Sequence, residues 1–178
     1  MNGEIHTARD VTKFDTGKVD AFRSGDYGPL GSVDPDAIVY HRISLYRENV
    51  WTDKLDPNID LLKAVAGMDG RYIQTSIATG VKAIVIEAFG RGNLPASIVP
   101  DIKAALEQNI LVVICSRTYT GRVLTEYGYE GGGKHLAEIG CLLAGDLKGI
   151  KVRLKLMALF GKYGDPDVVK RFFLQSRN

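Results

Sequence analysis

Two glycine-rich segments hold the residue types and spacings that could do chemistry, and the first is Gly128–Lys134. It reads G-x-x-x-x-G-K, the pattern of a loop whose backbone N–H groups and lysine bind nucleotide phosphates. That mechanism needs a Ser or Thr after the lysine to hold magnesium, and this chain has His135 there. The preceding residues, Val-Leu-Thr-Glu-Tyr, are too polar for the buried strand that normally leads into such a loop. We therefore expect a flexible glycine loop and no nucleotide cofactor.

The second segment is Gly90-x-Gly92, which lies between a predicted strand and a predicted helix. A dinucleotide-binding turn would have a third glycine and would stand in the first strand–helix unit of its domain. This turn lacks the third glycine and stands in the second unit. Its glycines do let the backbone approach a ligand or another subunit closely, and the Asn93 amide can both donate and accept hydrogen bonds.

Metal and redox chemistry have no support in the spacing of the histidines or cysteines. His6, His41 and His135 are far apart in the sequence and do not resemble a ligand set. Cys115 and Cys141 each stand among apolar residues, and no C-x-x-C pair exists. We expect two buried free thiols, no metal and no cofactor.

The composition is that of an ordinary globular protein, with 45% hydrophobic residues and 25% charged residues. The formal net charge of +2 gives no indication of a nucleic-acid partner. No apolar run approaches the roughly 20 residues of a membrane-spanning helix. The first fifteen residues are polar and do not resemble a signal peptide, so we expect a cytoplasmic protein without membrane contacts.

The first part of the chain differs from the rest. Residues 14–36 are rich in Gly, Asp, Ser, Thr and Pro, and they show turn signals without a helical period. We expect an extended loop there with short pieces of strand. Residues 37–43 suit a short strand, and residues 44–58 are charged and suit a linker.

From residue 59 onward, apolar strands alternate with amphipathic helices. This pattern predicts a parallel sheet with helices on both faces, in a small doubly wound, flavodoxin-like α/β domain. Ligands of such sheets bind beyond the carboxyl ends of the strands, which here are followed by loops 89–95 and 116–133. The predicted strands are 59–65, 83–88 and 110–115, and the predicted helices are 69–78, 96–108, 136–143, 148–163 and 165–173.

Two of the helices have stripes of apolar residues that we expect to face the core. In helix 148–163 the stripe is Ile150, Leu154, Met157 and Leu159. In helix 69–78 it is Tyr72, Ile73 and Ile77.

Several motifs in a fixed order resemble bacterial L-asparaginases. They are ARDVTK, DAFRSGDYGPLGSV, FGRGNLP, VVICSRTYTGRV, YGYEGGGKHL and LKGIKVRLKL, and they extend from residue 2 to about residue 173. The resemblance implies a two-domain α/β amidohydrolase in which residues 1–43 belong to the end of the N-terminal domain. Residues 44–58 would be the linker, and residues 59–178 would be the C-terminal domain.

The resemblance also implies roles for particular residues. Lys13, in ARDVTK, corresponds to the lysine that moves protons beside a threonine. Asn93, in FGRGN, corresponds to the asparagine that reaches the substrate of a neighbouring subunit. A further substrate-binding residue falls among Glu126, Tyr127, Tyr129 and Glu130, and we favour Tyr129 or Glu130.

The threonine nucleophile of the family has no counterpart in these 178 residues, which contain neither Gly-Gly-Thr nor Thr-Asp-Thr. We therefore expect part of an enzyme that hydrolyses asparagine, and to some extent glutamine, within a homo-oligomer whose active sites lie at subunit interfaces. We expect the chain to be inactive alone, with Lys13 an ordinary charged lysine and residues 1–36 loosely held. The alternative is a non-catalytic α/β binding or interaction module derived from an asparaginase.

Overall fold

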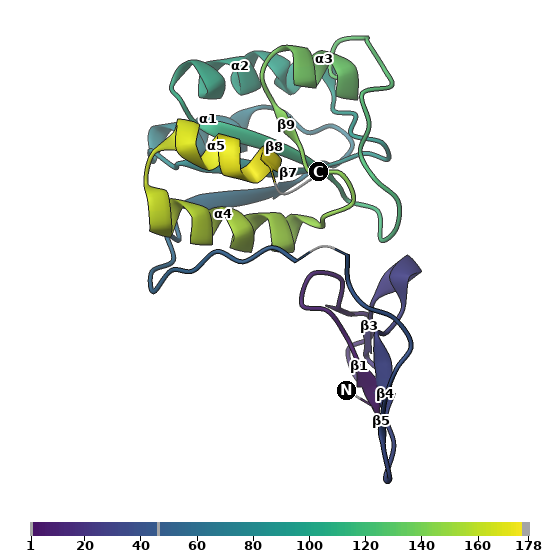
Figure 1. Cartoon of the computed structure of the whole chain (residues 1–178). Helices are drawn as coiled ribbons and strands as arrows, with labels where there is room; N and C mark the ends of the chain where they lie inside the picture. Colours follow the sequence, from purple (N-terminus) through teal and green to yellow (C-terminus); the bar gives the residue numbers. More distant parts are fainter. Residues whose placement is uncertain (1, 46, 176–178) are drawn as a thin grey trace. The chain divides into compact units, whose positions relative to one another are not determined.

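The structure is a computed structural model that describes residues 2–45 and 47–175. The chain forms two compact units, residues 1–49 and residues 50–178, coloured purple to blue and blue to yellow (Figure 1). The first unit is built from short strands, and the second is built from strands and helices in alternation.

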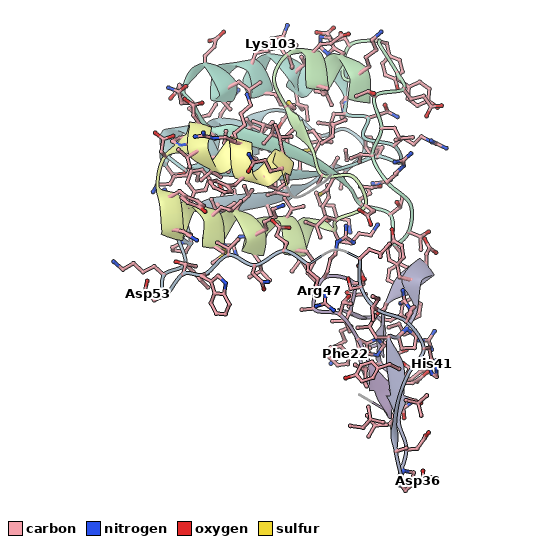
Figure 2. All side chains as sticks on the ribbon, viewed as in Figure 1. Phe22, Asp36, His41, Arg47, Asp53 and Lys103 are labelled. Carbon is pink, nitrogen blue, oxygen red and sulfur yellow. The ribbon has the colours of Figure 1, made fainter. Side chains whose placement is uncertain are left out.

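The first unit consists of small antiparallel sheets. Its strands are β1 (Glu4–Ile5), β2 (Thr12–Lys13), β3 (Phe22–Arg23), β4 (Gly31–Val33) and β5 (Ile38–Tyr40), and a single 3₁₀ turn, η1, covers Gly25–Tyr27. Strands β1, β4 and β5 form one sheet in that order, and β2 pairs with β3. Asp36 lies at the tip of the turn between β4 and β5 (Figure 2). Few side chains of this unit are buried, Ala21 and Ser24 among them, because strands this short make no continuous apolar face.

The second unit contains a parallel sheet, as the sequence predicts, and this sheet has four strands. Its strands are β6 (Ile59–Lys63), β7 (Ala83–Ala88), β8 (Leu111–Ser116) and β9 (Leu142–Leu143). They stand side by side in chain order, with Leu61 opposite Val85, Val85 opposite Val113, and Val113 opposite Leu142. The carboxyl ends of all four strands therefore lie at one edge of the sheet.

Helices cover both faces of this sheet, so the predicted α/β architecture is confirmed (Figure 1). Along β7, Ile84 and Ile86 pack against the helices of one face, and Ala83 and Val85 pack against those of the other. The first face carries α1 (Arg71–Ala78), the 3₁₀ turn η2 (Ala96–Ile98), α2 (Val99–Glu107) and α3 (Gly133–Glu138). The second carries α4 (Gly149–Tyr163) and α5 (Pro166–Gln175). None of the helices in the described ranges is long and apolar enough to cross a membrane.

One predicted helix was wrong in part. The segment 136–143 holds the end of α3 and then strand β9, which pairs with Val113 and Ile114 of β8. Gly140, with a φ of 112°, stands between the two elements and allows the helix to end. A strand of two residues shows no periodicity, and this is why the sequence does not reveal it.

Two apolar stripes were also partly wrong. Ile150 and Leu154 of α4 are 62% and 48% exposed, whereas Val152 and Leu156 are fully buried. Both pairs have the spacing of one helical face, so periodicity alone does not tell which pair faces the sheet. In α1, Ile73 is buried as predicted, but Tyr72 is 59% exposed.

Candidate functional site

Asn93 lies in a tight turn directly after β7. Phe89 and Asn93 face each other as a bridge, with the Asn93 N–H donating to the Phe89 carbonyl at 3.0 Å and the Phe89 N–H donating to the Asn93 carbonyl at 3.0 Å. Three residues close this turn, and two of them, Gly90 and Gly92, have positive φ values of 42° and 108°. A side chain at Gly92 would also press on Val123, with Cβ atoms 3.3 Å apart. The glycines of the FGRGN motif are therefore needed to place Asn93 at the carboxyl edge.

The Asn93 side chain carries an unsatisfied polar atom. Its Oδ1 is buried and accepts no hydrogen bond from any residue that the structure describes. A buried amide oxygen without a donor costs about 1–3 kcal/mol. Buried polar groups are almost always paired, so this oxygen makes Asn93 a candidate ligand-binding residue.

The glycine loop, residues 118–133, packs directly against this turn. The Leu94 N–H donates to the Gly131 carbonyl at 2.8 Å, and the Leu124 N–H donates to the Arg91 carbonyl at 3.0 Å. The Arg91 guanidinium lies 3.2 Å from the Glu126 carboxylate. Backbone and side-chain contacts thus bring the two predicted ligand-binding loops together.

Three consecutive glycines of this loop are needed for close packing. Gly131, Gly132 and Gly133 are all buried. A Cβ at any of them would collide with a backbone carbonyl oxygen, those of Leu94, Tyr127 and Leu124 respectively. These three residues of the predicted glycine loop therefore pack closely against neighbouring backbone.

Tyr129 and Glu130 are both exposed at this part of the loop. The Tyr129 side chain is 56% exposed, and its ring lies 5.7 Å from that of Tyr127. Of the four residues that the sequence left open, Glu126 is engaged by Arg91, and the carbonyl of Tyr127 accepts from the Lys134 N–H at 3.0 Å. The structure therefore brings Asn93 and the loop carrying Tyr129 and Glu130 to one edge of the second unit.

Lys13 belongs to the first unit. It ends β2 and stands opposite Phe22 of β3, and its side chain is exposed. The adjacent Phe14 N–H donates to the Ala21 carbonyl at 2.6 Å, and the Arg23 guanidinium lies 4.8 Å from the centre of the Phe14 ring. These contacts fix the hairpin that presents Lys13.

Sequence reasoning missed two residues at the end of β8 that organise this edge. The buried Ser116 hydroxyl donates to the Gly90 carbonyl at 2.6 Å and is 2.7 Å from the Thr118 hydroxyl. The Arg117 guanidinium donates to the Ala64 carbonyl at 2.9 Å and lies 4.4 Å from the centre of the Phe89 ring. The available signal was a polar triplet, Ser-Arg-Thr, directly after a buried strand. These contacts join the ends of β6, β7 and β8.

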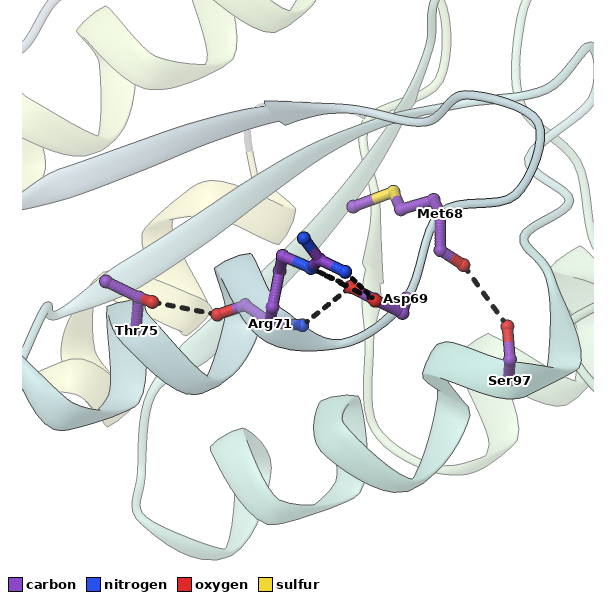
Figure 3. Close-up of polar contacts among 5 residues, drawn as sticks. All are labelled: Met68, Asp69, Arg71, Thr75 and Ser97. Carbon is purple, nitrogen blue, oxygen red and sulfur yellow. Dashed lines mark hydrogen bonds and ion pairs between the residues drawn. The ribbon is translucent and has the colours of Figure 1, made fainter.

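The turn between β6 and α1 is held at the same edge (Figure 3). The Ser97 hydroxyl donates to the Met68 carbonyl at 3.3 Å. The Asp69 carboxylate accepts from the Arg71 backbone N–H at 3.2 Å and from the Arg71 guanidinium at 2.7 Å. The guanidinium bond, aided by the backbone bond, lowers the pKa of Asp69. This carboxylate therefore binds Arg71, the first residue of α1, through both its backbone and its side chain.

The cysteines offer no nucleophile. Both are buried and free, and burial raises the pKa of Cys115 and of Cys141 to about 12. A thiol held neutral in this way attacks nothing near neutral pH. Within the described ranges, no group of three or more His, Cys, Asp or Glu side chains is placed to hold a metal ion.

The fold and this edge define an α/β domain with a polar site beyond the carboxyl ends of a parallel sheet. Residues 58–173 match the glutaminase/asparaginase C-terminal domain, and residues 1–46 match the N-terminal domain of asparaginases. The chain belongs to the glutaminase/asparaginase family, as its motifs predict.

Relatives within the family differ in their named activity. The chain is 33% identical over 163 residues to L-asparaginase of Bacillus licheniformis, covering 92% of this chain and 51% of that protein. It is 35% identical over 179 residues to a probable L-asparaginase of Deinococcus radiodurans, covering 98% and 54%. It is also 33% identical over 174 residues to a glutamyl-tRNA(Gln) amidotransferase subunit of Pyrococcus horikoshii, covering 95% and 39%. The chain thus spans about half the length of the L-asparaginases it matches.

Proposed function

We propose that this chain supplies the supporting side of an amidohydrolase active site that hydrolyses L-asparagine to L-aspartate and ammonia. The observation that supports the proposal is the buried Oδ1 of Asn93, which has no hydrogen-bond partner among the described residues and lies at the carboxyl edge of the sheet. An amino-acid substrate has an ammonium group and a side-chain amide, and either can donate to this oxygen.

The chemistry divides between this chain and another segment. A threonine outside these 178 residues attacks the side-chain amide and forms a covalent acyl-enzyme, which water then hydrolyses. Lys13 takes part in the proton transfers, and Asn93 with Tyr129 or Glu130 binds the substrate of a neighbouring subunit. The proposed assembly is a homo-oligomer, and the isolated chain is inactive because it lacks the nucleophile. A cytoplasmic location stays a prediction.

Glutamine is a weaker proposed substrate. It is longer than asparagine by one methylene, and a difference of this size is worth about 1–3 kcal/mol of discrimination in a fitted pocket. Some glutaminase activity therefore fits the same site.

Two other functions are open. The relative from Pyrococcus horikoshii favours a role as a subunit of a tRNA-dependent amidotransferase. A non-catalytic α/β binding or interaction module is the second alternative. Neither alternative requires Lys13 or Asn93 to contribute to the hydrolysis of free asparagine. Substitutions at these two residues therefore distinguish the proposed hydrolase from both alternatives.

A fusion protein tests the proposal. The part of the Bacillus licheniformis L-asparaginase that this chain does not match is joined to this chain, and ammonia release from asparagine is measured. We expect turnover that Lys13→Ala lowers about 10²–10⁴-fold, the usual contribution of a proton-transfer group. Asn93→Ala should lower kcat/KM about tenfold or more, through the lost substrate contact.

A matched control lies in the same segment as Lys13. Lys18 is also exposed, and its ammonium group is 3.8 Å from the Asp15 carboxylate in an ion pair of little energetic weight. Lys18→Ala should leave turnover unchanged. An active fusion protein in which Lys13→Ala and Lys18→Ala behave alike would rule out the role proposed for Lys13.

A further inference from the structure

His135 holds the glycine loop through a hydrogen bond that only a neutral imidazole can make. The Gly131 backbone N–H donates to His135 Nδ1 at 3.3 Å. Protonation of the imidazole turns Nδ1 from an acceptor into a donor, so the bond is lost and two N–H groups face each other. Histidine changes charge within about pH 5–8.

The position of His135 on its helix explains this contact. Helix α3 begins at Gly133 after a capping residue, Gly132, that has no side chain to cap it. His135 is the third helical residue, the position from which Glu or Gln side chains commonly reach back to a backbone N–H before the helix. Here the imidazole binds the N–H one residue further back, that of Gly131, while the Gly132 N–H donates to the Tyr129 carbonyl at 2.8 Å.

Gly131 also contacts the turn that carries Asn93. Its N–H is held by His135, and its carbonyl accepts from the Leu94 N–H at 2.8 Å. Glu130 precedes Gly131 in the chain, and Asn93 precedes Leu94. The residues next to this hydrogen-bonded pair, Glu130 and Asn93, are therefore both candidate substrate-binding residues, and they lie on two different loops.

The surrounding charges do not replace the bond. On α3, Lys134 and Glu138 lie 3.9 Å apart, and Arg91 is paired with Glu126 across the two loops. None of these groups supplies another acceptor for the Gly131 N–H. The other titratable or charged side chains of the loop are Tyr119, Arg122, Tyr127, Tyr129 and Glu130, and Arg117 directly precedes it. Those of the neighbouring α2 are Asp101, Lys103 and Glu107.

We propose that His135 is a pH-dependent positioning residue for the edge that carries Asn93, Tyr129 and Glu130. The neutral imidazole fixes Gly131, and the protonated imidazole releases it and loosens the loop. The contact is present while the imidazole is neutral and is lost when the imidazole gains a proton. The proposal concerns the chain itself and does not depend on which substrate the edge binds.

Amide hydrogen exchange in the whole chain tests this. Protection factors, which are corrected for the intrinsic pH dependence of exchange, are measured for the Gly131 and Leu94 amides at about pH 8 and about pH 5. In the natural sequence we expect Gly131 protection to fall about tenfold at the lower pH, the factor expected for loss of one hydrogen bond. The Ile114 amide, inside β8, should show no such change.

Two substitutions separate the titration from the packing. His135→Gln keeps an acceptor at the same helical position but does not titrate, so Gly131 should stay protected at both pH values. His135→Ala should leave Gly131 poorly protected at both. Equal protection of Gly131 at both pH values in the natural sequence would overturn the proposal. A loss of protection in His135→Gln that parallels the natural sequence would also overturn it, even if His135→Ala failed to fold.

Discussion

The two loops of the candidate site are held together mainly by hydrogen bonds between backbone groups of individual residues. The hydrogen bonds between Leu94 and Gly131 and between Leu124 and Arg91 join the two loops, and both are backbone to backbone. From the sequence, the glycines of the turn at Gly90 could be expected to allow a close approach. The partner in that approach could not be predicted, because no local pattern links residues about forty positions apart.

At this scale Gly132 gives the sharpest prediction. A Cβ there collides with the Tyr127 carbonyl oxygen, whereas a Cβ at Gly128, in the same loop, meets only the flexible end of Lys134 at 3.9 Å. Neither glycine has a φ value that disfavours a side chain, so the two positions differ only in the space around them. Gly132 is crowded, and Gly128 is open. Gly132→Ala should lower the free energy of unfolding by about 2–4 kcal/mol, in the range of overpacked positions.

The control, Gly128→Ala, should change the free energy of unfolding much less, because the added methyl group meets open space. Urea denaturation of the two variants and the natural sequence provides the measurement. Equal stability of the two variants would show that the loop is not packed as described.

At the scale of elements, a strand that is buried on both faces of the sheet is the easiest element to predict from the sequence. Strand β7 was predicted with its observed bounds because Ala83–Ala88 is an almost entirely apolar run between turn signals. Strand β9 was missed because two residues carry no period. Helix α4 was predicted within a residue, but its buried face was not, because its apolar residues surround much of the helix.

The corrected face of α4 can be tested with two leucines of the same helix. Leu156 is fully buried in the core between α4 and the sheet, and Leu154 is 48% exposed. Leu156→Ala should lower the free energy of unfolding by about 2–5 kcal/mol through lost burial and a residual cavity. Leu154→Ala should cost under about 1 kcal/mol.

Thermal or urea denaturation of both variants gives the comparison. A larger loss from Leu154→Ala than from Leu156→Ala would restore the stripe of Ile150 and Leu154 as the packed face. It would also contradict the orientation of α4 described above.

At the scale of the whole molecule, the chain has two compact units, and each of them carries candidate functional residues. The first unit presents Lys13 on a short hairpin, and the second presents Asn93, Tyr129 and Glu130 at the carboxyl edge of a parallel sheet. Family motifs assign these roles, since neither hydrophobic periodicity nor charge pattern singles out any of the four residues. The nucleophile is the part of the proposed chemistry for which the 178 residues offer no candidate motif.

The absence of a nucleophile is tested by measuring ammonia release from asparagine by the purified chain alone. We expect no release above the background of buffer and asparagine, and no difference between the natural sequence and Lys13→Ala. Circular dichroism would establish that both proteins are folded. Turnover by the chain alone that disappears in Lys13→Ala would contradict the account, because the 178 residues would then contain a complete active site.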